Sequence, residues 1–243
     1  MKEAICSPRP IQTAKAGYPS VFAMALAVLV GMLITAGTMS AAIIDIINPG
    51  FEAGPSTYVV SGWTATSGGG GRAPTTGGLA PHTGTYWGFL DPVSVIPASL
   101  SQILKVGGSN LHVNAGDQIT VTVYQGLRPD MVTMYPSPAG DQILNIRLWA
   151  DAVGSGTLLT TATFGNATVN GWDLRTCSYT AGTAAAGHDL YVEFQDPHGI
   201  TRQIALDDVS AVYTAVVPEP GLLCLLGLGG SLLWPARRNR KQR

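Results

Sequence analysis

Three stretches of the sequence, residues 119–124, 144–149 and 190–195, alternate aliphatic side chains with aromatic or polar ones. The aromatic and polar set could bind a sugar. Successive residues of a strand face opposite sides of the sheet, so the aromatic and polar set faces outward when the aliphatic set faces the interior. The outward-facing residues that we single out are Tyr124, Arg147, Trp149, Tyr191 and Glu193. An aromatic ring covers the apolar face of a pyranose, and neighbouring polar groups hydrogen-bond its hydroxyl groups. The same side chains could instead form cross-strand pairs that shield the sheet beneath a covering loop.

The sequence does not contain a pattern that predicts catalysis. The four histidines, His82, His112, His188 and His198, fall in separate turns and lack the HExxH spacing of a zinc hydrolase. The central part of the chain has no GxSxG nucleophile turn, no Walker loop and no dinucleotide fingerprint. We therefore expect a protein that is not an enzyme.

The central part of the chain is acidic. Residues 43–214 contain six Lys and Arg against thirteen Asp and Glu, although the whole chain has a formal net charge of −1. This excess of acids argues against nucleic acid as a partner, because a phosphate backbone attracts cationic surfaces. Cys177 is the single cysteine of this part, so a disulfide framework within it is excluded and its core must come from packing.

The spacing of apolar residues predicts strands rather than helices. A period of two over residues 119–124, 144–149 and 190–195 is typical of half-buried antiparallel strands. Further strands are expected at 85–90, 99–106, 158–164, 172–179 and 204–213, with turn-forming residues between them. No helix is expected between the two ends of the chain. Many short strands without helices indicate an all-β fold, an antiparallel β-sandwich of one domain.

Short motifs near the two ends of the central part follow a recognisable order. They are Asn48 to Glu52 (NPGFE), then Trp63, and finally Ile204 to Ser210 (IALDDVS). Together they resemble the first and last strands of a galactose-binding-like jelly roll, as in the family 4 and family 9 carbohydrate-binding modules. The resemblance implies a structural Ca²⁺ that joins these strands, with Glu52 and Asp207 as carboxylate ligands. Two solvated carboxylates at the edge of the sandwich are the alternative.

The C-terminal end combines three features in a fixed order. It has the turn sequence Val217-Pro218-Glu219-Pro220-Gly221, an apolar run over 222–234 and a basic end that includes Arg237 and Arg238. This order resembles the PEP-CTERM sorting tail of exported proteins of Gram-negative bacteria. The resemblance implies a transient anchor in the inner membrane that an exosortase removes near the Pro-Glu-Pro turn. Since the apolar run is shorter than the roughly 20 residues that span a bilayer comfortably, a permanent anchor is one alternative and a buried helix is another.

The N-terminal end has the order of a signal peptide. Lys2, Arg9 and Lys15 precede an apolar run over 21–36, and Ser40-Ala41-Ala42 provides small residues after it. We expect signal peptidase to cut after Ala42 or one residue earlier, and an uncleaved signal anchor is the alternative. In either case the basic C-terminal end stays inside and the region between the two apolar runs is exported.

These features together predict an exported cell-surface or extracellular-matrix protein in three parts. Residues 1–42 form the signal peptide, 43–214 the β-sandwich and 215–243 the sorting tail. The expected partners are signal peptidase, an exosortase and an exopolysaccharide or other glycan. A purely structural matrix protein without a ligand is one alternative, and a carbohydrate-active enzyme is another.

Overall fold

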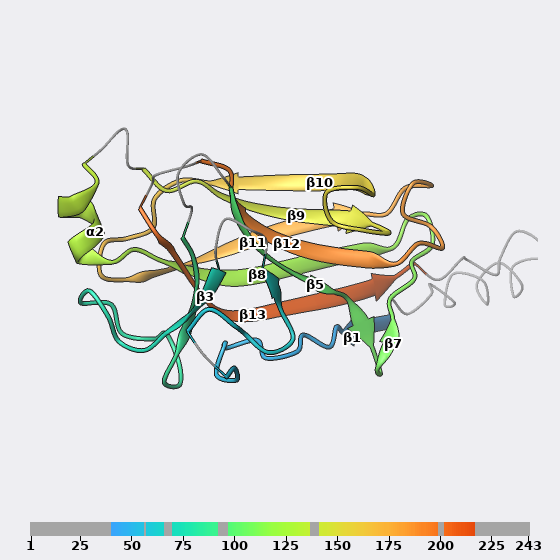
Figure 1. The fold of residues 1–243 in the computed structure, drawn as a ribbon. Coiled ribbons are helices and arrows are strands. Elements are labelled where there is room, and N and C mark those ends of the chain that lie inside the picture. The colour runs from blue at the N-terminus through green and yellow to red at the C-terminus, as the bar shows by residue number, and fades with distance from the viewer. Residues whose placement is uncertain are drawn as a thin grey trace, which may run out of the picture. The chain divides into compact units, whose positions relative to one another are not determined.

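Two antiparallel β-sheets lie face to face in the computed structural model of this chain (Figure 1). The structure describes residues 40–55, 57–65, 70–91, 97–136, 141–198 and 202–216. The signal peptide up to residue 39 and the tail from residue 217 onward lie outside the described residues, so both remain predictions.

Eleven strands of the described part form the two sheets. The six-stranded sheet contains β1 (Ser40–Ile43), β3 (Gly70–Ala73), β4 (Trp87–Leu90), β8 (Gln118–Gly126), β11 (Trp172–Thr180) and β13 (Ile204–Ala215). The five-stranded sheet contains β2 (Thr64–Ala65), β5 (Ala98–Ile103), β9 (Leu144–Ala150), β10 (Thr157–Phe164) and β12 (Leu190–Asp196). A small hairpin of β6 (Lys105–Val106) and β7 (Ser109–Asn110) stands apart from both.

The strand order is that of a jelly roll. The main strands run in the order β11-β8-β13-β4 in one sheet and β10-β9-β12-β5 in the other, and all their pairings are antiparallel. The chain passes between the sheets at most of its connections, which distinguishes this arrangement from two separate meanders. The expected all-β antiparallel sandwich is therefore confirmed, and each strand expected between residues 85 and 213 has a counterpart in the structure. The motif at 48–52, expected in the first strand of the jelly roll, forms a turn instead.

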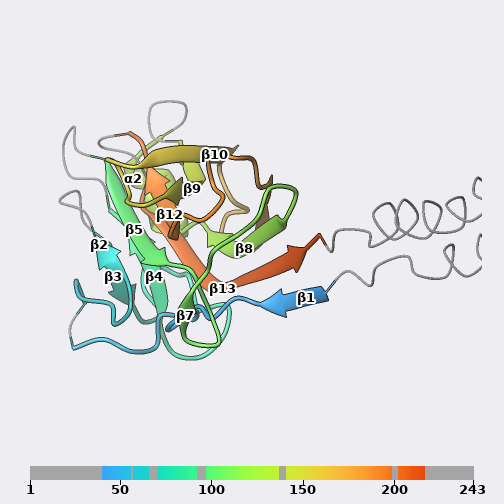
Figure 2. The same cartoon turned by 90° about the vertical axis from the view of Figure 1, so that its right-hand side faces the viewer.

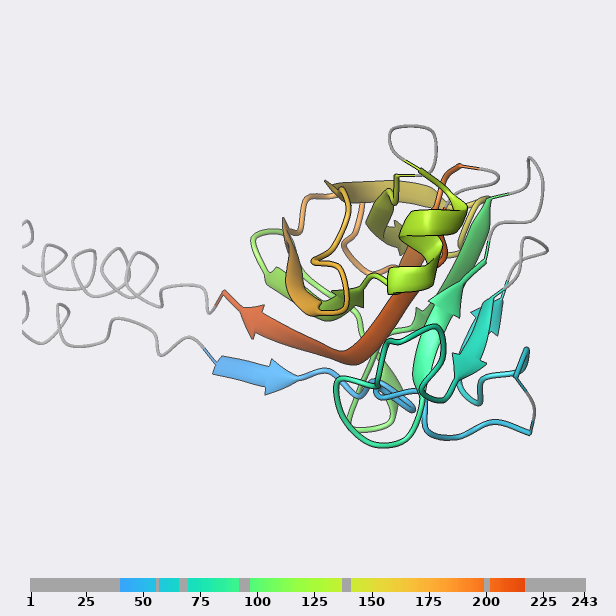
Figure 3. The same ribbon diagram turned by 90° about the vertical axis from the view of Figure 1, so that its left-hand side faces the viewer.

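One short helix, α2 (Pro129–Met134), departs from the expectation that helices are absent between the two ends. Pro129 stands in its first turn together with Asp130, and both residues suit a helix N-terminus. Figures 1 and 3 show α2 at one end of the sandwich, and Figure 1 shows the β6–β7 hairpin toward the other. Within the described residues, no helix has the length and apolarity needed to cross a membrane.

The interior confirms the period of two in the sequence. Ile146, Leu148, Val192 and Phe194 are fully buried between the sheets, and the residues that alternate with them face outward. Trp63 completes this core, and its ring packs against the Phe194 ring at a centroid distance of 5.6 Å. The large apolar interior therefore decides which side chains the outer faces present.

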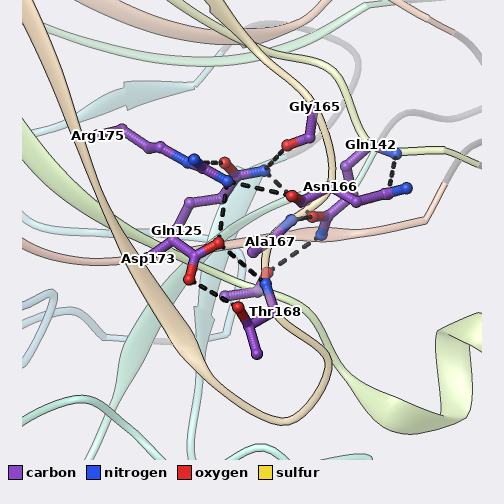
Figure 4. Close-up of polar contacts among 9 residues, drawn as sticks. Gln125, Gln142, Gly165, Asn166, Ala167, Thr168, Asp173 and Arg175 are labelled. Atoms are coloured by element: carbon purple, nitrogen blue, oxygen red, sulfur yellow. Dashed lines mark hydrogen bonds and ion pairs between the residues drawn. The ribbon is translucent and has the colours of Figure 1, made fainter.

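A buried polar network joins the two sheets near one end of the interior (Figure 4). Gln125 on β8 donates to the side-chain oxygen of Gln142, which lies just before β9, at 3.1 Å. Arg175 Nε donates to Gln125 Oε1 at 2.8 Å, and Gln142 Nε2 donates to the backbone oxygens of Gly126 and Gln203. Both glutamine side chains are fully buried, so these hydrogen bonds are what makes their burial tolerable.

The first and last described strands pair with each other. Ser40 lies opposite Ala215, and Figure 2 shows β1 beside the end of β13. Asp117 holds this end of β13, because its carboxylate accepts hydrogen bonds from the Tyr213 hydroxyl at 2.7 Å and from the Val216 amide at 2.8 Å. Burial alone would raise the pKa of Asp117, but these hydrogen bonds and those from Asn114 outweigh it, so the pKa is lowered. The first and the last described strands of the chain therefore lie next to each other.

Candidate functional site

Four side chains form a row across the outer face of the five-stranded sheet. Trp149 on β9 lies opposite Tyr191 on β12, Tyr191 lies opposite Ile103 on β5, and Leu158 on β10 lies opposite Trp149. We call these four residues the aromatic row. Neighbouring strands are about 4.8 Å apart, so the row is about 14 Å long. Leu158 is exposed and the other three are partly buried, which makes the row an accessible apolar strip.

Polar side chains run beside the aromatic row, two residues along each strand. Arg147 on β9 lies opposite Glu193 on β12, which lies opposite Ser101 on β5. Glu193 Oε2 accepts a hydrogen bond from Trp149 Nε1 at 2.8 Å and lies 3.8 Å from Arg147 Nη1. The Glu193 side chain is only 4% exposed, so it is not accessible to a ligand. Its role is to orient Trp149 and Arg147.

Arg147 keeps hydrogen-bonding capacity for a ligand. Its side chain is 22% exposed, and its contact with Glu193 at 3.8 Å is an ion pair but too long for a hydrogen bond. Its Nε atom is buried without a partner among the described residues and is therefore closed to a ligand. The N–H donors on the two terminal nitrogens of the guanidinium group remain for the hydroxyl groups of a sugar.

A pocket of about 340 Å³ opens at the end of the aromatic row, where Ile103 and Tyr191 belong to its lining. This volume is at the lower end of the range for small-molecule sites. The five-stranded sheet thus brings together an apolar strip, polar groups beside it and a concave end. Of the five residues predicted to bind a glycan, this face gathers four: Arg147, Trp149, Tyr191 and Glu193.

The structure separates Tyr124 from the other four residues. Tyr124 lies on β8 of the six-stranded sheet, and its ring is stacked on the ring of His82 with a centroid distance of 3.7 Å and an interplanar angle of 19°. The two outer faces point away from each other across the core. Alternation along β8 correctly predicts that Tyr124 faces outward, but it cannot say which sheet contains β8.

The two residues predicted to bind calcium, Glu52 and Asp207, both accept hydrogen bonds from backbone amides of the segment 82–86. Glu52 Oε1 accepts hydrogen bonds from the backbone amides of Thr85 at 2.8 Å and Tyr86 at 3.0 Å. Asp207 Oδ2 accepts from the amides of His82 at 2.9 Å and Thr83 at 3.2 Å. Asp207 therefore fastens the segment 82–86 to β13, and Glu52 fastens it to the loop before β2. Both carboxylates act as acceptors for backbone amides that no strand satisfies.

A third carboxylate completes this acidic cluster. Asp208 sits at an irregularity of β13 with a positive φ of 45°, and its oxygens contact His82 Nδ1 and Thr83 Oγ1, each at 2.6 Å. A Cβ atom placed on Gly50 would lie 3.6 Å from Oδ1 of Asp207 and 3.6 Å from Oδ1 of Asp208. We call Glu52, Asp207 and Asp208 the acidic cluster.

The acidic cluster has the hard oxygen donors that Ca²⁺ prefers, but much of their capacity is used. Glu52 Oε1 and Asp207 Oδ2 each accept two amides, and Asp207 Oδ1 accepts the Asp208 amide at 2.8 Å. In the described part of the chain, no group of three or more His, Cys, Asp or Glu is arranged to hold a metal ion. Calcium at this place would have to share oxygens with the segment 82–86.

Asp207 is an unusual carboxyl group even without a metal. It is fully buried, and this burial raises its pKa to about 7. The backbone amides of Thr83, Asp208 and His82 oppose the shift, while the neighbouring negative charge of Asp208 adds to it.

The sorting motif Val217-Pro218-Glu219-Pro220-Gly221, with Arg237 and Arg238, lies outside the described residues. Sequence reasoning did not single out His82, Asp208 or the walls of the pocket. The pair of acids at 207 and 208 was a visible signal for Asp208. No local signal marks His82, which lies 42 residues before its ring partner Tyr124 in the chain.

No known protein family and no curated protein sequence matches this chain. Among solved structures, a cyclase from Fischerella sp. TAU aligns with a TM-score of 0.57 and 17% identity over 74% of this chain and 100% of the cyclase. The xylan-binding CBM22-1 domain of Paenibacillus barcinonensis Xyn10C aligns with a TM-score of 0.44 and 15% identity over 75% of this chain and 98% of that domain. At 17% identity the likeness to the cyclase shows a shared fold alone, and a TM-score of 0.44 carries no weight.

The buried carboxyl group of Asp207 predicts a pH-dependent stability. In a chelator-containing buffer, the free energy of unfolding should fall by a few kcal/mol as the pH rises from about 4 to about 7. The reason is that the unfolded chain ionises Asp207 near its usual pKa of 3.8, whereas the folded protein resists ionisation until about 7. The variant Asp207→Asn should lack this decrease, as measured by urea unfolding at several pH values.

Asp151→Asn is the matched control, because the Asp151 side chain is 59% exposed. It should keep the wild-type pH profile. Parallel profiles for wild type and Asp207→Asn over this range would contradict the assignment.

Proposed function

We propose that this protein is a non-catalytic glycan-binding protein and that the outer face of its five-stranded sheet holds the glycan. The observation that supports this most is the hydrogen bond from Trp149 Nε1 to the buried Glu193, which fixes an accessible indole ring in line with Tyr191. A ring held in this way loses little conformational entropy when a sugar stacks on it. The neighbouring Arg147 supplies donors for the hydroxyl groups.

The charges of this face favour an uncharged glycan. Arg147 and Glu193 form an ion pair with each other, so the aromatic row and its polar neighbours carry no net charge. The row runs across four strands for about 14 Å, which suits a chain of several sugar rings lying across the strands better than a single sugar. A neutral exopolysaccharide has these properties.

Removing either aromatic ring of the row should weaken binding. We expect Trp149→Ala and Tyr191→Ala each to weaken glycan binding by at least about tenfold, because a central aromatic contact typically contributes this much to an interface. Binding is measured on an array of neutral plant and bacterial polysaccharides, followed by calorimetry with the best ligand. Circular dichroism and thermal melting verify that each variant is folded.

Two other tyrosines serve as controls. Tyr58 is 69% exposed but lies outside the row, so Tyr58→Ala should bind like wild type. Tyr124→Ala removes the ring stacked on His82 and should change stability without changing affinity. No binding by the wild-type protein would favour a purely structural matrix component. An equal loss in Tyr124→Ala would move the site to the other sheet.

We further propose that the protein is exported and then sorted by its C-terminal tail, on the strength of the two terminal sequence patterns. Signal peptidase and an exosortase are the processing partners, and the cell surface or the extracellular matrix is the destination. The pairing of Ser40 with Ala215 means that both hydrophobic segments are attached at neighbouring points of the sandwich. A cut after Ala42 would remove most of β1, whereas an uncleaved signal anchor would keep it.

Mass spectrometry of the protein purified from its native envelope tests this processing. The expected N-terminus is Ile43 or Ala42, and the expected C-terminus lies near the Pro-Glu-Pro turn. A full-length chain recovered from the soluble cytoplasmic fraction would contradict export. A mature N-terminus with an intact tail would support export but replace the transient anchor by a permanent one.

A structural Ca²⁺ at Glu52 and Asp207 is a separate proposal. Its support is the position of the Asp207 and Asp208 carboxylates beside Gly50 and the repulsion between them, which a cation would relieve. We expect millimolar Ca²⁺ at pH 7.5 to raise the melting temperature by several degrees and EDTA to reverse the effect. Asp207→Asn should lose most of this response. An identical melting temperature of the wild-type protein with Ca²⁺ and with EDTA would contradict a structural role of Ca²⁺.

A further inference from the structure

The pocket at the end of the aromatic row has mainly aliphatic walls. Ile47 lies at its rim, Ile103 comes from the end of β5, and Ala152 and Val153 come from the turn after β9. Tyr191 connects the pocket to the aromatic row, because it belongs to both. A substituent on the sugar ring that stacks on Tyr191 would therefore lie at the pocket.

The polar residues of the lining are Thr64, Ser101, Gln102 and Tyr191. Thr64 on β2 and Ser101 on β5 are paired across the strands, and Ser101 Oγ donates to the Thr64 backbone oxygen at a long 3.4 Å. The Thr64 hydroxyl has no hydrogen bond to another described residue. None of the described lining residues is charged. The pocket therefore suits an uncharged group that is mostly apolar and has one hydrogen-bond acceptor.

The wall at Ile47 is held in place by a buried side chain. Gln102 Oε1 accepts the Ile47 amide at 2.8 Å, and Gln102 Nε2 donates to the backbone oxygens of Ile47 at 3.0 Å and Gly62 at 2.6 Å. Gly62 has a φ of +85°, and a Cβ there would lie 2.6 Å from Ile47 Cγ2. Glycine thus permits this close approach, and the three hydrogen bonds make the pocket a built feature of the fold.

We infer that this pocket binds the acetyl group of an acetylated neutral glycan; the inference rests on the proposed function of the adjoining row. An acetyl methyl group matches the walls of Ile103, Ala152 and Val153, and the acetyl carbonyl oxygen can accept a hydrogen bond from the hydroxyl of Thr64 or Ser101. An unsubstituted sugar would leave the apolar walls in contact with water, and a charged substituent would be desolvated without a partner.

The test compares ligands with and without acetyl groups. O-acetylated xylan and other acetylated neutral polysaccharides are assayed before and after mild alkaline deacetylation. Chitotetraose, which has acetamido groups at C2, is compared with cellotetraose, which has hydroxyl groups there. The wild-type protein should bind the acetylated member of at least one pair about tenfold more tightly, because one small apolar group in a hydrophobic pocket typically changes affinity by this much or more.

Variants of the pocket locate the preference. Val153→Ser removes part of the wall in an exposed turn and Ala152→Leu fills the space, so each should reduce the preference to about twofold or less. Affinity for the deacetylated member should stay close to that of wild type. Val169→Ser is the matched control, because Val169 is 50% exposed and does not belong to the pocket lining.

The outcomes separate a failure of acetyl recognition from a failure of glycan binding itself. Equal binding of acetylated and deacetylated ligands would overturn the inference and leave glycan binding intact. A preference for acetylated ligands that survives in both Val153→Ser and Ala152→Leu would place acetyl recognition elsewhere and also overturn it. Failure of the wild-type protein to bind any ligand of either kind would overturn the proposed function and the inference together.

Discussion

The pairing register of β9 and β12 is the constraint on which the proposed site depends. Trp149 lies opposite Tyr191 and Arg147 opposite Glu193 only in this register, and the buried residues between them fix it. Leu148 and Val192 are fully buried, so a shift of one strand by a single residue would expose its whole apolar set and bury its polar set. The buried residues therefore specify which side chains lie side by side on the outer face.

The two outer faces of the sandwich differ in how they are used. On the six-stranded sheet, Asp207 binds backbone amides of the segment 82–86, and His82 covers Tyr124. The chain itself therefore covers this part of the outer face, whereas Leu174 and Val212 on the same face are exposed. On the five-stranded sheet, Trp149 and Tyr191 remain accessible, and a pocket adjoins them. Around Tyr124 the outer side chains are therefore covered by the chain, and the buried Asp207 there makes stability depend on pH. On the five-stranded sheet the two aromatic rings stay accessible to a ligand.

Local sequence patterns predict the strands well because the period of two is imposed by the backbone itself. The outward direction of Trp149, Tyr191 and Glu193 follows from that period, and so does the sandwich. Which strands become neighbours does not follow, because pairing depends on contacts between distant segments. The sequence therefore groups Tyr124 with residues of the other sheet. For the same reason it cannot predict that Gln102 positions Ile47 beside Val153, nor that Asp207 binds amides some 125 residues earlier in the chain.

Side-chain NMR can show whether a glycan lies on the five-stranded sheet. Each tryptophan contributes one indole N–H signal, and that of Trp149 reports the hydrogen bond to Glu193. On titration with a bound polysaccharide, we expect shifts for Trp149 and for the ring of Tyr191, while the signals of Trp172 on the six-stranded sheet and of His82 beside it stay in place. Shifts confined to His82, Tyr124 and Trp172, with an unchanged Trp149 signal, would contradict it.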